Sequence, residues 1–292
     1  MGTARKLKMN FAGRFIELLG QQMYGGPVPS VAELIANSWD ADAEKVEVSV
    51  PEDLTDPNAE IVVKDYGKGM SFEEINDFYL SVGYERRERG ERTAKDRLVM
   101  GRKGIGKLAG FGIAENIVIR SAQNKHVVQF DLNYTELKAK KTLVGYEFTP
   151  SVDEDCQEDN GVTVTYKNLK VKQNINLENF RKSMGRRFAL ETGQMEIIIN
   201  GQALTKEDLD FEFRTPEDGW QEEDIPGFGK VSYWFGFLKS PISDPELRGV
   251  SIFARDRIAQ VTPFFFNLAG GINGQVGLEY LTGQIKANQL DE

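Results

Sequence analysis

Three polar side chains at helical spacing are the first residues whose chemistry can be specified. Glu33, Asn37 and Asp40 lie four and three residues apart in the stretch Glu33–Ala41, so a helix places all three on one face. Asn is a poor helix former, and most surface helices carry Lys, Arg and Glu instead. An acid, an amide and a second acid on one face suit a metal ion and a water molecule, although an ordinary exposed helix accounts for the same pattern.

A second group of residues follows a predicted strand. Ile61–Asp65 is expected to form a strand that ends on an acid, and the glycine turn Asp65-Tyr-Gly-Lys-Gly-Met70 comes directly after it. A carboxylate at the end of a strand can face a pocket and accept a hydrogen bond from an exocyclic amine. Gly67 and Gly69 let the backbone pass close to a flat base, where a Cβ atom would clash.

A glycine-rich loop supplies the third group, Gly101-Arg-Lys-Gly-Ile-Gly-Lys107. Gly104 and Gly106 are expected to expose backbone N–H groups at the start of a short helix over Leu108–Ile113. Such N–H groups form a natural seat for phosphate. Lys107 or Lys103 would add positive charge there, although a solvated loop explains Arg102 and Lys103 equally well.

In this order and at these spacings, the three groups resemble the GHKL (Bergerat) ATPase superfamily. That superfamily includes the gyrase B subunit, the MutL proteins, the large heat-shock chaperone, the MORC proteins and the sensor histidine kinases. The resemblance covers about Ser30 to Leu169 and is nearest to MORC-like and chaperone-like bacterial ATP-binding proteins. It implies an α+β fold: a two-layer α/β sandwich with a mixed sheet over residues 1–170, including a lid at 83–107. A smaller transducer-like α/β domain is expected over residues 171–292.

The resemblance also implies roles for individual residues. Asp65 would read the adenine of ATP, and Met70 would touch the face of the base. Asn37 would be the ligand for Mg²⁺, which takes few protein ligands, and Glu33 would accept a proton from the attacking water. Asp40 would support the bound waters or the Asp65 side of the pocket. The full set expected to contact nucleotide is Asn37, Asp40, Ala41, Asp65, Gly67, Gly69, Met70, Gly101, Gly104, Ile105, Gly106, Lys107 and Thr163.

Two positions depart from the superfamily pattern. Many relatives carry Gly-Thr on the strand behind the adenine site, whereas this chain has Gly161-Val-Thr163, and we expect Thr163 to supply the hydroxyl. The basic residue that many relatives insert from the second domain is not obvious. Lys286 is the candidate, unless the equivalent group falls beyond residue 292. We expect the chain to be truncated at its C-terminus and to hydrolyse ATP slowly.

Several local elements follow from periodicity. Helices are expected over Asn10–Tyr24, about Phe72–Ser81 and Leu177–Leu190, strands over nine segments, and a solvated loop over Asp153–Asp159. Ser30 and Glu33 match a capping box, so Glu33 has the alternative role of capping its own helix. The strand segments are 45–50, 61–65, 116–122, 126–132, 146–149, 161–166, 195–199, 231–238 and 249–259.

Composition excludes several classes of site. The chain has 292 residues, of which 40% are hydrophobic and 28% are charged, as in ordinary globular proteins. A single cysteine, Cys156, excludes an intramolecular disulfide, and its acidic neighbours argue against a catalytic thiolate. One histidine, His126, nearly excludes a His-based metal cage; it is expected to be a partly buried core residue.

Net charge and hydropathy limit the classes of partner and the location that can be expected. The net charge of −9 does not favour nucleic acid overall, but Glu85–Lys107 holds nine basic and four acidic residues. The resemblance implies an ATP-dependent homodimer, and the basic segment leaves DNA as an open possibility. No apolar run is long enough to span a membrane and no signal peptide is recognisable, so a cytoplasmic location is expected.

Three alternatives make distinct predictions. Gly101–Lys107 satisfies the P-loop pattern, but Leu108 replaces the Ser or Thr that would hold Mg²⁺, and a P-loop enzyme has no need of Glu33. A histidine kinase shares the fold but carries Asn or His at the Glu33 position, since it must not activate water. A nucleotide-gated scaffold would bind ATP and dimerise with little turnover.

Overall fold

The computed structural model describes residues 26–81, 92–97, 99–100, 106–143, 147, 149–188, 194–205, 210–242, 248–254, 257–258, 277–287 and 289. The helix predicted over Asn10–Tyr24 lies outside these residues, as do Gly101, Lys103, Gly104 and Ile105. The backbone of Gly106 and Lys107 is described, but the Lys107 side chain is not.

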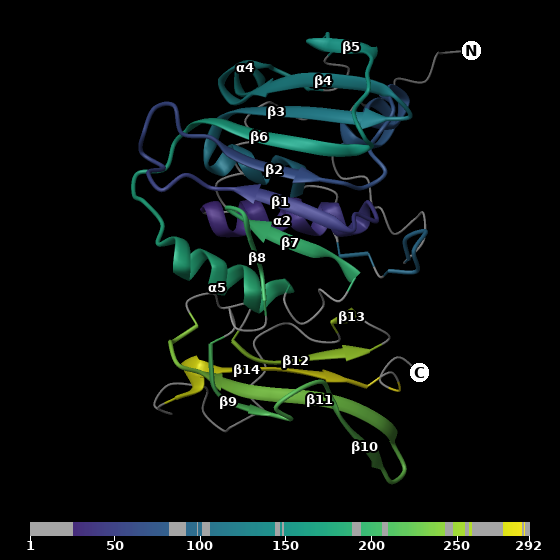
Figure 1. Cartoon of the computed structure of the whole chain (residues 1–292), viewed down its shortest axis with the longest axis vertical. Helices are drawn as coiled ribbons and strands as arrows, with labels where there is room; N and C mark the ends of the chain where they lie inside the picture. The colour runs from purple at the N-terminus through teal and green to yellow at the C-terminus, as the bar shows by residue number, and fades with distance from the viewer. Residues whose placement is uncertain are drawn as a thin grey trace, which may run out of the picture. The chain divides into compact units, whose positions relative to one another are not determined.

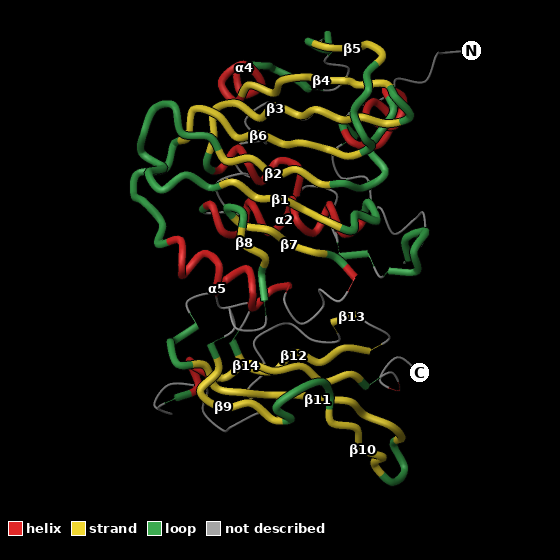
Figure 2. The backbone as a smooth tube through the Cα atoms, viewed as in Figure 1, coloured by secondary structure: helices red, strands yellow, loops and turns green. Residues whose placement is uncertain are grey.

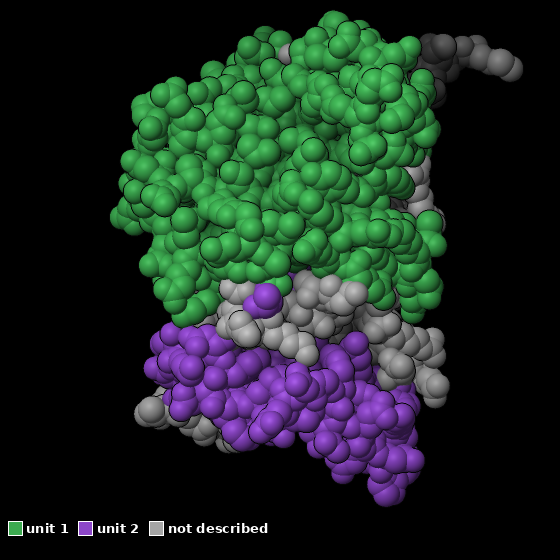
Figure 3. Space-filling model, in the orientation of Figure 1, with its two compact units in different colours: residues 1–184, 191–204 green, residues 185–190, 205–292 purple. Residues whose placement is uncertain are grey.

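The chain divides into two compact units (Figure 3). Unit 1 comprises residues 1–184 and 191–204, and unit 2 comprises residues 185–190 and 205–292. This division differs from the boundary expected near residue 170. The reason is that a strand at 196–199 pairs with the first strand of the chain, so this part of the sequence completes the sheet of unit 1.

Unit 1 is built on one eight-stranded mixed sheet in the described residues, with the order β5-β4-β3-β6-β2-β1-β7-β8. Neighbouring strands are antiparallel except β1 and β7, which are parallel. The strands are β1 (Lys45–Ser49), β2 (Ile61–Asp65), β3 (Ala114–Gln123), β4 (His126–Asn133), β5 (Val152–Asp155), β6 (Gly161–Leu169), β7 (Glu196–Ile199) and β8 (Gln202–Ala203).

Alternation of buried and exposed residues shows which face of the sheet is covered. In β2, Ile61, Val63 and Asp65 are buried while the residues between them are not. Alternate residues of a strand point to opposite faces, so Asp65 shares the covered face with two core aliphatic residues. The acid therefore ends the strand inside unit 1 and not in solvent.

Helices cover that face of the sheet. Figures 1 and 2 show α2 (Pro27–Asp40) running behind β1. The other helical elements of unit 1 are α3 (Phe72–Glu74), the π-helical turn η1 (Ile75–Tyr79), the 3₁₀ helix η3 (Gly106–Gly112), α4 (Tyr134–Ala139) and α5 (Leu177–Phe188), of which α5 crosses the unit boundary at Gly185. Fully buried members of the core include Ile35 of α2, Phe111 of η3 and Tyr166 of β6.

Unit 2 contains a second sheet. Its order is β10-β11-β14-β12-β13, and β9 also pairs with β11. The elements are β9 (Phe211–Thr215), β10 (Gln221–Ile225), β11 (Gly229–Leu238), β12 (Gly249–Ala254), β13 (Arg257–Ile258), the 3₁₀ turn η7 (Leu278–Tyr280) and β14 (Leu281–Lys286).

Two expected elements differ from those observed. The edge strand β5 lies at Val152–Asp155, in a stretch expected to be a solvated loop, and not at residues 146–149, of which 147 and 149 are described outside any strand. The helix expected after Phe72 becomes a short α-turn and a π-helical turn. Within the described residues, no helix is both long and apolar enough to cross a bilayer.

Candidate active site

The polar face predicted for α2 is present in the structure. Glu33, Asn37 and Asp40 are each half-buried, whereas Leu34, Ile35, Ser38 and Trp39 on the other faces are buried. A helix with one buried face and one open polar face leaves the polar groups available at the edge of the core. The three side chains therefore share one surface, as their spacing predicted.

Glu33 does not cap the helix. The helix begins at Pro27 with Gly26 as the N-cap, so Ser30 lies inside the first turn. The Ser30 hydroxyl, which is fully buried, contacts the carbonyl oxygens of Gly26 at 2.9 Å and Ala109 at 3.1 Å. The capping-box interpretation is therefore wrong, and Ser30 instead connects α2 to η3. Glu33 is seven positions into the helix, where its side chain has no capping role to fill.

Asp65 is held in a fixed orientation. It is 7% exposed, and its Oδ1 accepts hydrogen bonds from the backbone N–H of Gly67 at 2.9 Å and of Val162 at 3.2 Å. Among the described residues, Oδ2 has only a 3.5 Å contact from the Ser38 hydroxyl. Burial raises the pKa of Asp65, although the two amides oppose that shift. One oxygen is thus fixed by the backbone, and the other has acceptor capacity left for a ligand.

The glycine turn after Asp65 tolerates no larger residue. A Cβ atom on Gly67 would lie 2.7 Å from the carbonyl oxygen of Ala41, and one on Gly69 would lie 2.0 Å from that of Ala122. Gly69 also has a φ of +68°, which favours glycine. The sequence predicted a close backbone approach by these glycines. In the structure the neighbouring atoms are backbone of α2 and β3, so the turn is wedged between them.

Backbone contacts join this turn to the end of α2. Lys68 donates its N–H to the carbonyl oxygen of Ala41 at 3.1 Å, and Tyr66 donates to Lys45 at 3.1 Å. The sequence groups containing Asn37 and Asp65 are therefore brought together, with Ala41 between them. Ser30 brings η3 to the other end of the same helix. All three predicted groups thus meet on α2 wherever they are described.

Hydrogen bonds to Ser121 of β3 hold the backbone of Met70 in place. Its backbone N–H donates to the Ser121 hydroxyl at 2.8 Å, and Ser121 contacts the Met70 carbonyl oxygen at 3.0 Å. Ser121 is fully buried. The Gln123 amide donates to Glu74 at 2.9 Å and lies 3.4 Å from the Gly69 carbonyl oxygen. Neither Ser121 nor Gln123 was identified from the sequence, since both look like ordinary strand residues.

The strand register does not place Thr163 beside Asp65. In the pairing of β2 with β6, Lys64 is opposite Thr163 and Val63 is opposite Val164. Thr163 therefore belongs to the sheet face opposite that of Asp65. The residue next to Asp65 is Val162, whose backbone N–H donates to the carboxylate. The expectation that Thr163 supplies a hydroxyl is at odds with this register, and the Val162 amide takes its place.

The chain leading into the glycine loop is fastened to the end of α2. Asp40 Oδ1 accepts a hydrogen bond from the backbone N–H of Met100 at 2.7 Å. Asp42, which has a φ of +58°, accepts hydrogen bonds from the Thr93 hydroxyl and from the Ala94 backbone N–H. Asp40 was expected to support bound waters or the Asp65 side of the pocket; the contact seen here is with the residue before Gly101.

Arg97 is a buried cation in the same region. It is 3% exposed, its guanidinium lies 4.7 Å from the ring centre of Trp39, and it donates to the carbonyl oxygens of Ala43, at 2.6 Å, and Gln194. Charge-assisted hydrogen bonds and an aromatic face offset the cost of burying the guanidinium. Arg97 therefore binds the segment before the glycine loop to α2 and to the residues before β7.

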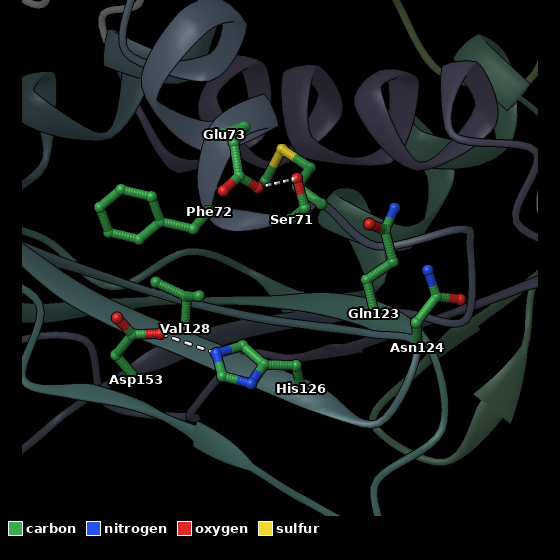
Figure 4. Close-up of a pocket in the computed structure, with 9 residues that line it drawn as sticks. Ser71, Phe72, Glu73, Gln123, Asn124, His126, Val128 and Asp153 are labelled. Atoms are coloured by element: carbon green, nitrogen blue, oxygen red, sulfur yellow. Dashed lines mark hydrogen bonds and ion pairs between the residues drawn. The ribbon is translucent and has the colours of Figure 1, made fainter.

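A hollow of about 460 Å³ opens beside Met70 (Figure 4). It shares only Met70 with the predicted site, and His126 lines its far side. His126 is half-buried, as expected, but its side chain is 43% exposed and lies at the margin of the sheet, not in the core. Its ring nitrogens contact Asp153 at 2.7 Å and Asp155 at 3.2 Å, and these hydrogen bonds raise its pKa. The histidine thus fastens the edge strand β5.

The described geometry suits an adenine nucleotide. A buried carboxylate with a spare acceptor lies at a turn whose glycines bring the backbone close, and a neighbouring helix presents an acid and an amide. These groups can accept a hydrogen bond from an exocyclic amine, offer a neutral oxygen to Mg²⁺, and take a proton from water.

Comparison with known proteins agrees with this geometry. Residues 27–163 match the family model described as "Histidine kinase-, DNA gyrase B-, and HSP90-like ATPase". This segment is a GHKL-type ATPase domain. The match begins at the first residue of α2 and ends in β6, so the GHKL segment contains α2, the Asp65 turn and η3.

The chain is also similar to a protein of Herpetosiphon aurantiacus named "Putative type II restriction enzyme HgiDII". The two are 28% identical over 208 residues, which is 70% of this chain and 33% of that protein. The chain thus spans about a third of the length of this relative.

Proposed function

We propose that this chain binds ATP with Mg²⁺ through its GHKL domain and hydrolyses it slowly. The observation that carries the proposal is the Asp65 carboxylate, which is buried, fixed by two backbone amides and placed beside a turn that only glycine can form. Few structural roles require a buried, unpaired carboxylate, because burying such a charge is costly. A hydrogen bond from the adenine amine to Asp65 would account for this buried carboxylate.

Each residue has a defined task in the proposed reaction. Glu33 accepts a proton from a water molecule, the water oxygen attacks the γ-phosphorus, and the bond between that phosphorus and the ADP oxygen breaks. The Asn37 amide oxygen would hold Mg²⁺, which supplies charge neutralisation at the phosphates when bound. The half-buried positions of both side chains on one helix face suit these tasks, since solvent and nucleotide can reach them.

The phosphate end of the site is proposed from the chain on either side of the glycine loop. Met100 is fixed to Asp40, and Ala109 of η3 is fixed to Ser30. Gly101, Gly104, Ile105, Gly106 and Lys107 lie between these two points. Closure of the segment 83–107 over the nucleotide, with ATP-dependent dimerisation, completes the proposed cycle.

A basic residue from unit 2 is part of the same proposal. Lys286 is the candidate, and in unit 2 its ammonium lies 4.4 Å from the ring centre of Trp220. Without such a residue at the γ-phosphate, turnover would be slow and the chain would act mainly as a nucleotide-gated scaffold, which is the alternative function. The MORC-like resemblance is compatible with either outcome.

DNA is the proposed client of the cycle. The similar protein from Herpetosiphon aurantiacus is named as a putative restriction enzyme, and residues 85–107 carry an excess of basic side chains. Binding through such residues would weaken steeply with salt, because phosphate contacts release counterions. A titration with duplex DNA that shows no salt dependence would remove DNA from the proposal.

Substitution of Asp65 by Asn tests the nucleotide site. Asn retains an acceptor for the Gly67 and Val162 amides, but its own NH₂ group would face the amine of adenine. We expect ATP affinity to fall at least about 100-fold, measured by calorimetry. Asp131→Asn is the matched control, since Asp131 is an exposed acid in the same sheet and its loss changes the net charge equally. Unchanged affinity in Asp65→Asn would refute the proposed site.

A further inference from the structure

The tyrosine at position 166 is an unusual member of the core. Tyr166 lies in β6, is fully buried, and its hydroxyl has no hydrogen-bond partner among the described residues. A buried hydroxyl without a partner costs roughly 1–3 kcal/mol, so a phenylalanine would fill the same space at lower cost. Such a group calls for an explanation in the function of the protein.

The surroundings of Tyr166 place it under the helix that follows the glycine loop. A Cβ atom on Gly110 of η3 would lie 2.3 Å from Cε1 and 2.7 Å from Cζ of the Tyr166 ring. The phenol end of the ring is therefore covered directly by η3, and glycine at position 110 is what lets the helix lie there. The Cβ atom of an alanine at position 110 would clash with the Tyr166 ring.

The helix η3 contacts both Tyr166 and α2, the helix that carries Glu33. Ala109, next to Gly110, accepts the hydrogen bond from Ser30, and Glu33 lies three residues beyond Ser30 on α2. The pKa of the Tyr166 hydroxyl is well above its usual value, first because of burial and then because of Tyr79 of η1 and the carboxylate of Glu33. Glu33 belongs to α2 and Tyr79 to η1, so the charges that act on the phenol come from these two elements.

We propose that Tyr166 is a positioning residue for Glu33. Its hydroxyl donates a hydrogen bond to the Glu33 carboxylate, or to a water molecule held by it, in the state that hydrolyses ATP. In a site shielded from solvent, one such bond orients the carboxylate toward the attacking water. Tyr166 touches neither nucleotide nor metal in this scheme, so it acts on the rate and not on affinity.

The inference rests on the proposed function, and a double-mutant cycle tests it. Tyr166→Phe removes only the oxygen. We expect the single-turnover rate of ATP hydrolysis to fall about 10-fold or more, with ATP affinity unchanged. In a Glu33→Gln background, Tyr166→Phe should cause no further loss, because its effect passes through the carboxylate. A purely structural role would lower the rate equally in both backgrounds.

Tyr134→Phe is the matched control. Tyr134 is also a buried tyrosine of unit 1 without a described hydroxyl partner, but its ring packs against Phe111 and Lys170. We expect its removal to leave hydrolysis unchanged. A wild-type rate in Tyr166→Phe, or an equal loss in the Glu33→Gln background, would overturn the inference alone. Wild-type turnover by Glu33→Gln would overturn the proposed function, and the inference with it.

Discussion

At the scale of single residues, Asp65 shows how burial and hydrogen bonding compete. Burial disfavours the charged carboxylate, while the amides of Gly67 and Val162 favour it, and the net effect is a raised pKa. The folded protein therefore accepts a charge that it would otherwise avoid. A ligand amine that donates to Oδ2 would recover part of this cost, which links the pKa of the apo protein to its affinity for adenine.

The raised pKa predicts how Asp65 affects stability with pH. Because the folded pKa lies above the unfolded one, the folded state binds the proton more tightly, and Asp65 becomes less favourable to folding as pH rises through these two values. Asp65→Asn should therefore be more stable than wild type at neutral pH, and the gap should narrow as the pH is lowered through the folded pKa.

Urea unfolding of both proteins at neutral and mildly acidic pH measures this gap. Taking the difference removes the effect of other carboxylates, such as Glu44 and Glu115, whose pKa values are lowered. A gap that widened toward acidic pH would mean that Asp65 is stabilised as a carboxylate by the fold. The burial argument would then be wrong.

At the scale of elements, the site is an arrangement around α2. Its first turn contacts η3 through Ser30, its last turn contacts the Asp65 turn through Ala41, and Asp40 contacts the end of the segment before the glycine loop. Each of these contacts uses at least one backbone atom, so they depend on close approach as well as on the Ser30 and Asp40 side chains. The glycines are therefore as important to the geometry as the charged residues.

Two glycines with positive φ allow the stability cost of close approach to be distinguished from the cost of the left-handed backbone. Gly69 (φ +68°) would bring a Cβ atom 2.0 Å from the Ala122 carbonyl oxygen, whereas Gly201 (φ +76°) has open space around it. Gly201→Ala should cost about 1–2 kcal/mol for the left-handed backbone alone. Gly69→Ala should cost about 1–3 kcal/mol more, because the turn must move away from β3.

Denaturant unfolding of the two variants measures the difference, and ATP binding gives a second comparison. We expect Gly69→Ala to lose nucleotide binding and Gly201→Ala, in the turn between β7 and β8, to keep it. Equal losses of stability in both variants would show that the Asp65 turn is not wedged against β3.

The sequence predicts much of this arrangement, and the failures have physical causes. The spacing of Glu33, Asn37 and Asp40 is a property of any helix, so their common face is predictable. Ser30 was assigned to a cap because its spacing to Glu33 matches a capping box, yet the helix starts three residues earlier with Pro27. Local spacing cannot reveal where a helix begins when tertiary contacts decide it.

The surroundings of Asp65 show a second limit. Thr163 carries the hydroxyl that the family pattern suggests, but a strand alternates its faces, and a shift of one residue moves a side chain to the opposite side of the sheet. The pairing of β2 with β6 determines which residue is next to Asp65. Ser121 and Arg97 were missed for a similar reason, since their importance comes from partners distant in sequence.

At the scale of the whole molecule, the two units are separate compact bodies along the chain. Unit 1 contains the described site residues, and unit 2 contains Lys286 on a sheet of its own. β7 and β8 close the sheet of unit 1, and α5 crosses the boundary between the units. Through this connectivity, the proposed nucleotide-dependent change in unit 1 would have a covalent path to unit 2.

Assembly should depend on nucleotide if the proposed cycle is correct. Addition of Mg²⁺ and a non-hydrolysable ATP analogue should raise the molar mass of the wild-type chain relative to the nucleotide-free sample. Asp65→Asn, treated in the same way, should show no such increase. Size-exclusion chromatography with light scattering measures both. An identical mass in every state would remove dimerisation from the proposal while leaving the ATPase site intact.

The central claim is that Glu33 activates water for ATP hydrolysis, and substitution of this one residue tests it most directly. Glu33→Ala should bind ATP as wild type does but hydrolyse it about 10²–10⁴-fold more slowly, so that ATP recovered from the protein stays intact. Hydrolysis and binding are measured on the same sample with labelled ATP. If Glu33→Ala binds ATP and hydrolyses it at the wild-type rate, Glu33 is not the general base and the proposed mechanism is wrong.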